Sequence, residues 1–105
     1  MYETGRVVVQ DDKEAVKWYR LAAEQGFAQA QINLGWFYSE GRGVVQDDVY
    51  AYMWYILAAS VGTADEVTLA STNRDHVATH MTSVQIEEAK NKARTCQANN
   101  FKQCE

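Results

Sequence analysis

Residues 38–62 read YSEGRGVVQDDVYAYMWYILAASVG, and residues 2–26 read YETGRVVVQDDKEAVKWYRLAAEQG. The two stretches align without a gap at an offset of 36 residues, and 15 of the 25 aligned pairs are identical. The identical pairs are Tyr2/Tyr38, Gly5/Gly41, Arg6/Arg42, Val8/Val44, Val9/Val45, Gln10/Gln46, Asp11/Asp47, Asp12/Asp48, Ala15/Ala51, Trp18/Trp54, Tyr19/Tyr55, Leu21/Leu57, Ala22/Ala58, Ala23/Ala59 and Gly26/Gly62. A repeat period between about 20 and 50 residues is typical of a solenoid or array, in which each unit packs only on its neighbours. The usual product of such packing is an extended binding surface.

Helical periodicity follows each glycine-containing turn. Apolar residues of the first copy recur at the 3.6-residue spacing of one helix face, namely Ala15, Trp18, Tyr19, Ala22 and Ala23. This pattern predicts helices at about 12–24 and 48–60, each with an aspartate pair that can cap its start. A further helical stretch at 28–39 ends at the glycines of the turn 40–43. The sequence therefore predicts an all-α fold, an α/α superhelical solenoid of antiparallel helix pairs with about five helices.

Composition bounds the size and the partners of the chain. Apolar residues make up 47% of the 105 residues, enough for one modest core and a single domain. The net charge of −4 lacks the basic surplus that a phosphate backbone requires, so nucleic acid is not an expected partner. No apolar run approaches the roughly 18 residues of a membrane span, and the first residues show no signal-peptide pattern.

More than a dozen positions at one spacing resemble the consensus of the SEL-one-like repeat, an α/α unit related to the tetratricopeptide repeat. They are Ala30, Leu34, Gly35, Tyr38, Gly41, Gly43, Val44, Asp47, Ala51, Trp54, Tyr55, Ala58, Ala59 and Gly62. The resemblance divides a single domain, 1–105, into a partial repeat at 1–26, a full repeat at 27–62, and a degenerate repeat with a C-terminal cap at 63–105. Val7 stands where the family has its second turn glycine, so we expect a distorted first turn.

The start of the chain inside a repeat leads to an expectation about assembly. The helix at 12–24 lacks the helix that would cover its apolar face, and an exposed apolar patch is uncommon on a soluble monomer. A symmetric homodimer would cover this face, with Val16 and Tyr19 at or near the contact.

The family resemblance also places a binding groove. In tetratricopeptide arrays the helix face turned away from the core lines a concave groove, and on the helix at 28–39 that face carries Gln29, Ile32, Trp36 and Ser39. We interpret these four residues as a partner-binding surface with Trp36 as the anchor, since Trp is enriched at binding hot spots. The alternative is that Trp36 packs on a neighbouring helix. Trp18 and Trp54 recur within the apolar stripe, so both are predicted to be core residues.

The two cysteines, Cys96 and Cys104, are eight residues apart. On a continuous helix they would lie about 12 Å apart, too far for a disulfide, so a bridge requires the helix to break, for which Asn99-Asn100 is suited. The spacing resembles that of cysteine-rich members of the family, in which such pairs bridge consecutive helices. A disulfide would favour a periplasmic or secreted location, and two reduced thiols would favour the cytoplasm.

Catalytic and metal-ligating patterns are weak. His76 and His80 are one helical turn apart, but no third ligand accompanies them, so a solvated helix face is the expected reading and no metal or other cofactor is predicted. Cysteine-rich relatives have been linked to β-lactam binding or weak hydrolysis, yet no serine here begins a Ser-x-x-Lys motif. We therefore expect a protein that is not an enzyme.

The predicted function is a scaffold or adaptor that binds a peptide or protein segment in its concave groove. Two alternatives remain open. One is a β-lactam-binding or hydrolase-like protein of the cysteine-rich repeat type, and the other is a purely structural module that self-associates.

Overall fold

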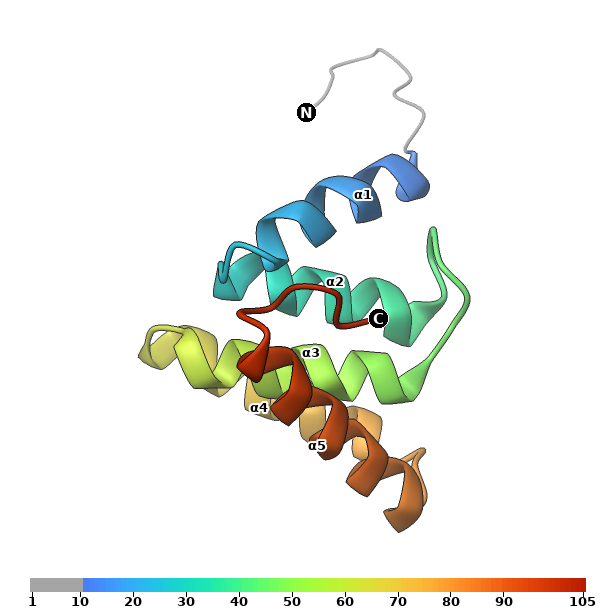
Figure 1. The fold of residues 1–105 in the computed structure, drawn as a ribbon. Coiled ribbons are helices and arrows are strands. Elements are labelled where there is room, and N and C mark those ends of the chain that lie inside the picture. The colour runs from blue at the N-terminus through green and yellow to red at the C-terminus, as the bar shows by residue number, and fades with distance from the viewer. Residues whose placement is uncertain (1–10) are drawn as a thin grey trace.

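Five helices make up the fold of residues 11–105, the part of the chain that the computed structural model describes. They are α1 (Asp12–Ala23), α2 (Ala28–Glu40), α3 (Asp48–Val61), α4 (Ala64–Ala78) and α5 (Ser83–Ala98). Helices α1 to α4 stack in chain order, and α4 and α5 both pack against α3 (Figure 1). The architecture confirms the predicted all-α solenoid. The first glycine turn with Val7 lies outside the described residues.

Side-chain caps fix where the helices begin. Asp11 accepts a hydrogen bond from the Glu14 backbone N–H at 3.1 Å, and the equivalent Asp47 accepts one from Tyr50 at 3.0 Å. The predicted capping role of the aspartate pairs is thus confirmed. The capping boxes of Thr63 and Thr82 start α4 and α5.

The core is centred on α3, which packs against three other helices. Its buried side chains are Ala51, Tyr52, Met53, Trp54, Tyr55, Leu57 and Ala58. Gly35 lets α2 approach this helix closely, because a Cβ atom there would lie only 2.7 Å from Cε1 of Tyr55. Trp54 is 1% exposed, as predicted for a core residue.

The turn between α2 and α3 packs on the start of α1. Gly43 has a φ of +73°, and a Cβ atom there would lie 2.5 Å from the Asp12 carbonyl oxygen. Arg42 donates two hydrogen bonds to the Asp12 carboxylate, at 3.0 and 3.2 Å. Because Arg42 and Asp12 belong to successive repeats, this ion pair links one unit to the next.

Candidate functional site

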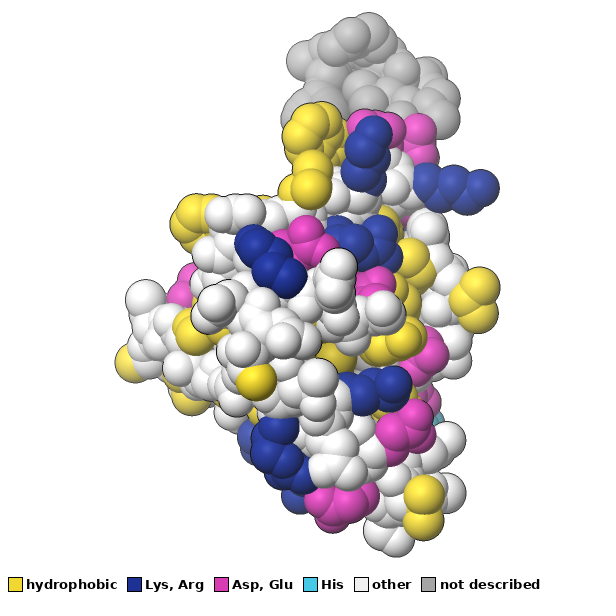
Figure 2. Space-filling view, in the orientation of Figure 1, with side chains coloured by type: hydrophobic (Ala, Val, Ile, Leu, Met, Phe, Trp, Pro, Cys, Tyr) yellow, Lys and Arg dark blue, Asp and Glu magenta, His cyan; other side chains and the backbone are white. Residues whose placement is uncertain are grey.

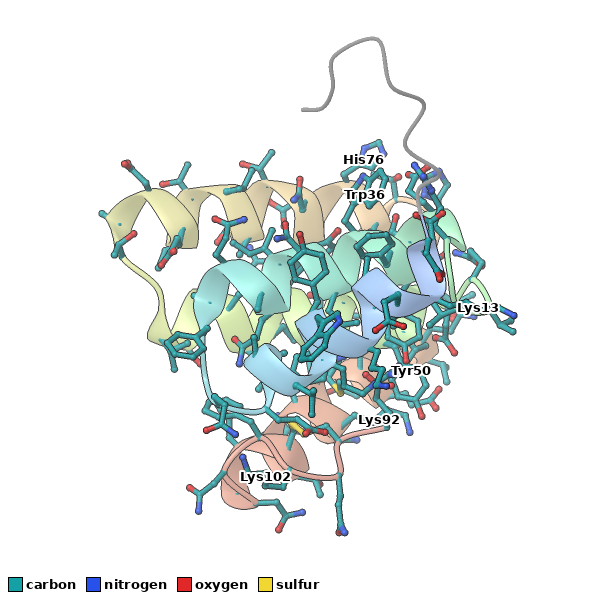
Figure 3. The ribbon with its side chains drawn as sticks, turned by 90° about the horizontal axis from the view of Figure 1, so that it is seen from above. Lys13, Trp36, Tyr50, His76, Lys92 and Lys102 are labelled. Carbon is teal, nitrogen blue, oxygen red and sulfur yellow. A yellow bond between two sulfur atoms is a disulfide. The ribbon has the colours of Figure 1, made fainter. Side chains whose placement is uncertain are left out.

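Trp36 lies on the outer side of α2 and is 40% exposed. Its ring meets the Phe37 ring edge to face with centroids 5.3 Å apart, and the Arg42 guanidinium lies 5.4 Å from its ring centroid. Figure 3 shows Trp36 and His76 on the side of the molecule that carries α4, away from Lys102. The indole is therefore held by two neighbours while part of its surface remains open.

The other three residues expected beside Trp36 occupy different environments. Gln29 is exposed and donates to Asn33 Oδ1 at 3.2 Å, whereas Ser39 is half-buried and its carbonyl accepts from Gln46 at 3.5 Å. Ile32 is only 3% exposed and belongs to the core, which differs from its expected place on the groove surface. The reason is that α1, α3 and α4 all contact α2, so little of its circumference stays open.

The outer face of α1 also differs from expectation. Trp18 is 61% exposed, so its prediction as a core residue was wrong. Val16 and Tyr19, which were expected at or near a dimer contact, pack inward instead. Val16 is 2% exposed, and the Tyr19 ring centroid lies 5.7 Å from that of Phe37. Among the described helices α1 has its main packing against α2 alone, whereas α3, which carries Trp54, packs against three helices. The Trp18 indole N–H instead donates to Glu14 at 2.9 Å, one turn earlier on the same helix.

A disulfide joins Cys96 to Cys104, as predicted, with the two Cα atoms 4.9 Å apart. The helix break at Asn99-Asn100 is also confirmed, because α5 ends at Ala98 and Asn100 has a φ of 55°. Phe101 and Gln103 likewise have positive φ values, 66° and 55°. The chain then turns back, and the residues after α5 run across α2 (Figure 1, dark red).

This C-terminal tail, residues 99–105, has three anchor points on the preceding repeats. The Phe101 ring lies against Gly26, where an added Cβ atom would be 3.4 Å from Cε2 of the ring. Lys102 Nζ donates to the Glu24 carbonyl oxygen at 2.7 Å. The side chain of Glu105 forms the third anchor.

Three donors from three successive helices converge on the Glu105 carboxylate. Arg20 of α1 contacts Oε1 through Nη2 at 2.9 Å and through Nε at 3.1 Å. The Trp54 indole N–H of α3 donates to Oε2 at 2.9 Å, and the Tyr38 hydroxyl of α2 donates to Oε1. Arg20 Nη2 also donates to the Tyr38 hydroxyl oxygen at 3.0 Å. We call Arg20, Tyr38 and Trp54 the carboxylate site.

Burial and neighbouring charges shift the pKa values of two residues of this site, Tyr38 and Arg20. Burial, and then the hydrogen bond to Glu105, raise the pKa of Tyr38 well above its usual range, so its hydroxyl stays protonated as a donor. Burial alone would lower the pKa of Arg20, but its hydrogen bonds to Glu105 and Tyr38 outweigh that effect and raise it. The site therefore keeps its donors in the form that binds a carboxylate.

A cleft of about 730 Å³ adjoins this site. Glu105 and Cys104 form one side of it, α5 forms another, and Tyr50 of α3 contributes an aromatic wall. Lys92 lies 5.5 Å from the Tyr50 ring centroid, and Figure 3 shows the two residues close together. A second cleft of about 290 Å³ lies beside Tyr52, Ile56 and α5. Neither cleft contains Gln29, Ile32, Trp36 or Ser39.

Catalytic geometry is sparse in the described part of the chain. The His76 and His80 rings meet edge to face at 5.7 Å, and within residues 11–105 no three His, Cys, Asp or Glu side chains gather as metal ligands. The face of the molecule in Figure 2 mixes acidic and basic side chains without a broad basic patch. None of the helices described here is long and apolar enough to cross a membrane.

The carboxylate site was not predictable from sequence periodicity, because Glu105 lies 51 residues from Trp54 in a segment without periodicity. The one sequence feature that pointed to this site was a difference between the two aligned repeats. Arg20 corresponds to Ile56, and Glu14 corresponds to Tyr50. Both changes fall beside a tryptophan that the repeats share.

Comparisons with known proteins agree with the fold. The sequence-family model of the Sel1 repeat matches residues 1–27 and 28–62. A solved structure described as a protective antigen of uropathogenic Escherichia coli strains, displaying an SLR fold, superposes with a TM-score of 0.77 at 30% sequence identity. The match covers 90% of this chain and 20% of that one, so this chain spans about a fifth of that protein. No curated protein matches the chain.

Repeats of this kind are generally scaffolds for protein interactions, typically without catalytic activity. Two successive matches to one repeat model, spanning residues 1–62, agree with the helix pairs and glycine turns described above. The chain belongs to the Sel1 repeat family.

Proposed function

We propose that this chain is a non-catalytic interaction module that binds a peptide or protein segment on the face of α2 around Trp36. The observation that carries the proposal is the environment of Trp36, which is 40% exposed yet held between Phe37 and Arg42. An aromatic anchor that is already ordered loses little conformational freedom on binding, so more of its contact energy appears as affinity.

The surroundings of Trp36 support a peptide ligand. Gln29 and Asn33 lie on the same side of α2 as Trp36, because Asn33 follows Gln29 by four residues and precedes Trp36 by three. The Gln29 and Asn33 amides hydrogen-bond to each other in an exposed position. Exposed amides beside an aromatic anchor supply the polar rim typical of protein interfaces. The net charge of −4 favours a protein partner over nucleic acid. The Cys96–Cys104 disulfide supports placement in an oxidising compartment, periplasmic or secreted.

A peptide library screened against the immobilised chain tests the proposal. Trp36→Ala is expected to weaken the selected peptides by about 30-fold or more, which corresponds to about 2 kcal/mol, while the melting temperature stays nearly unchanged. Trp18→Ala is the matched control, because it removes an even more exposed indole, 61% against 40%, on another helix.

Two outcomes would contradict this function. If the selected peptides still bind the Trp36→Ala variant but no longer bind the Trp18→Ala variant, the binding surface lies on α1. A large loss of stability in Trp36→Ala would make Trp36 a packing residue. The enzyme alternative is checked with a chromogenic β-lactam, for which we expect no turnover.

A further inference from the structure

We propose that Arg20, Tyr38 and Trp54 form a receptor site for one acidic side chain of an extended partner peptide, and that residues 99–105 occupy it as an intramolecular stand-in. This site is separate from the Trp36 surface, and the proposal does not depend on that surface binding anything.

The donor set specifies the ligand chemistry. Both Glu105 oxygens are used, Oε1 by Arg20 and Tyr38 and Oε2 by Trp54. With the tail in place Trp54 and Tyr38 are 1% and 6% exposed, so in this state their side-chain donors are shielded from water and are paired with Glu105. A carboxylate meets all three donors and balances the guanidinium charge, whereas a neutral amide leaves the charge of Arg20 uncompensated.

The occupant is attached like a bound peptide and lies outside the helix pairs of the solenoid. Residues 99–105 form no helix. Asn100, Phe101 and Gln103 adopt left-handed backbone, which asparagine tolerates but which is unfavourable for Phe101 and Gln103. Their contacts are an aromatic ring on Gly26, a lysine on a backbone carbonyl and the acidic side chain. Such a segment docks along α1 to α3 through a few side-chain anchors, as peptide ligands do.

The disulfide explains how a strained segment stays in place. Cys104 directly precedes Glu105 and is bonded to Cys96 at the end of α5. A short covalent tether raises the effective concentration of the attached side chain to the millimolar range or above, so a weak intrinsic affinity suffices for occupancy. An untethered partner segment must then either bind more tightly or meet a chain whose tail has been released.

Room for the rest of a partner peptide exists next to the carboxylate. Glu105 borders the cleft of about 730 Å³ whose walls include Tyr50 and Lys92. A peptide with its acidic side chain in the carboxylate site could therefore place its next residues against an aromatic ring and a cation.

Isothermal titration with a defined peptide tests the proposal on the 105-residue chain whose site has been opened by Cys104→Ser and Glu105→Gln. The probe is the acetylated, amidated peptide of residues 99–105 carrying Cys104→Ser, and the matched probe carries Glu105→Gln in addition. We expect the acidic peptide to bind with a Kd below about 1 mM and the matched probe to bind at least about tenfold more weakly. The oxidised chain with Glu105 intact should bind neither peptide.

Receptor variants separate recognition from general charge attraction. Arg20→Gln should abolish the preference for the acidic peptide, whereas Lys17→Gln, the same loss of charge at an exposed position on the same helix, should preserve it. Trp36→Ala should leave binding unchanged, so failure of the Trp36 proposal and failure of this one are distinguishable. Circular dichroism verifies that the opened chain is folded, and the single variant Glu105→Gln, with its disulfide intact, serves as a second receptor. Equal binding of both peptides, or no binding to either folded receptor up to about 1 mM, would overturn the proposal.

Discussion

Replacing Glu105 with glutamine should destabilise the oxidised protein more than the reduced protein. In the oxidised form the tether holds the side chain at the carboxylate site, where charge-assisted hydrogen bonds exceed neutral ones by about 1 kcal/mol each. The side chain of Arg20 is 35% exposed, so solvent screens part of its ion pair with Glu105, and Tyr38 and Trp54 supply the more deeply buried donors. We expect Glu105→Gln to lower the free energy of unfolding by about 1–2 kcal/mol in this form.

Reduction changes the balance between strain and contact in the tail. Left-handed backbone costs about 1–2 kcal/mol for a residue other than glycine or asparagine, and two such residues, Phe101 and Gln103, lie between Ala98 and Cys104. Without the tether this cost, together with ordering entropy, exceeds the contact energy, so the tail leaves the site and Glu105→Gln should cost less than about 0.5 kcal/mol. Closing a loop with a separation of eight residues is worth about 2.5 kcal/mol in the chain-entropy model. Reduction of the natural sequence should cost less than this amount, because the native state also relaxes.

Urea unfolding followed by far-ultraviolet circular dichroism, with and without dithiothreitol, measures the free energy of unfolding of the natural sequence and of Glu105→Gln in both redox forms. Glu88→Gln is the charge-matched control, because Glu88 is exposed on α5 and, unlike Glu105, forms no hydrogen bond or ion pair with Arg20, Tyr38 or Trp54. An equal cost of Glu105→Gln in both redox forms would refute the reasoning and show that the tail docks without help from the disulfide.

Three further expectations follow from the packing and from the titrating groups. Gly35→Ala should lower stability by about 1–3 kcal/mol in urea unfolding, since its methyl group would collide with the Tyr55 ring, and no loss would mean that the ring moves aside freely. Burial raises the pKa of both Tyr38 and Tyr55, so the unfolded chain releases their protons first and stability should fall above about pH 10. Replacing either tyrosine with phenylalanine should make the free energy of unfolding fall less steeply with pH between about pH 9 and 11. An unchanged pH dependence would contradict the role given to these two tyrosines. If the chain forms a homodimer, Trp18→Ala should weaken it in sedimentation equilibrium, whereas a monomer at all concentrations would contradict self-association.

Local and periodic features were predictable from the sequence because their causes lie within one repeat. The cap at Asp47 and the break after Ala98 both follow from residues within one turn or one helix of the feature. The environment of Ile32 and of Trp18 did not follow, because it depends on how many helices surround α2 and α1. A helical wheel gives the direction of a side chain, and the number of layers beyond that side chain is a property of the tertiary structure.

The two repeats show how identical residues acquire different roles. Each repeat places a tryptophan at the same position, and each indole N–H is paired with a carboxylate, Glu14 for Trp18 and Glu105 for Trp54. Glu14 is four residues before Trp18 and satisfies it locally, whereas the corresponding residue of the second repeat is Tyr50, which has no carboxylate to offer. The second indole must therefore take its acceptor from elsewhere, and Arg20, which aligns with Ile56, supplies the charge that attracts one. The proposed recognition of a carboxylate thus depends on positions at which the repeats differ, while the shared positions build the framework that holds them.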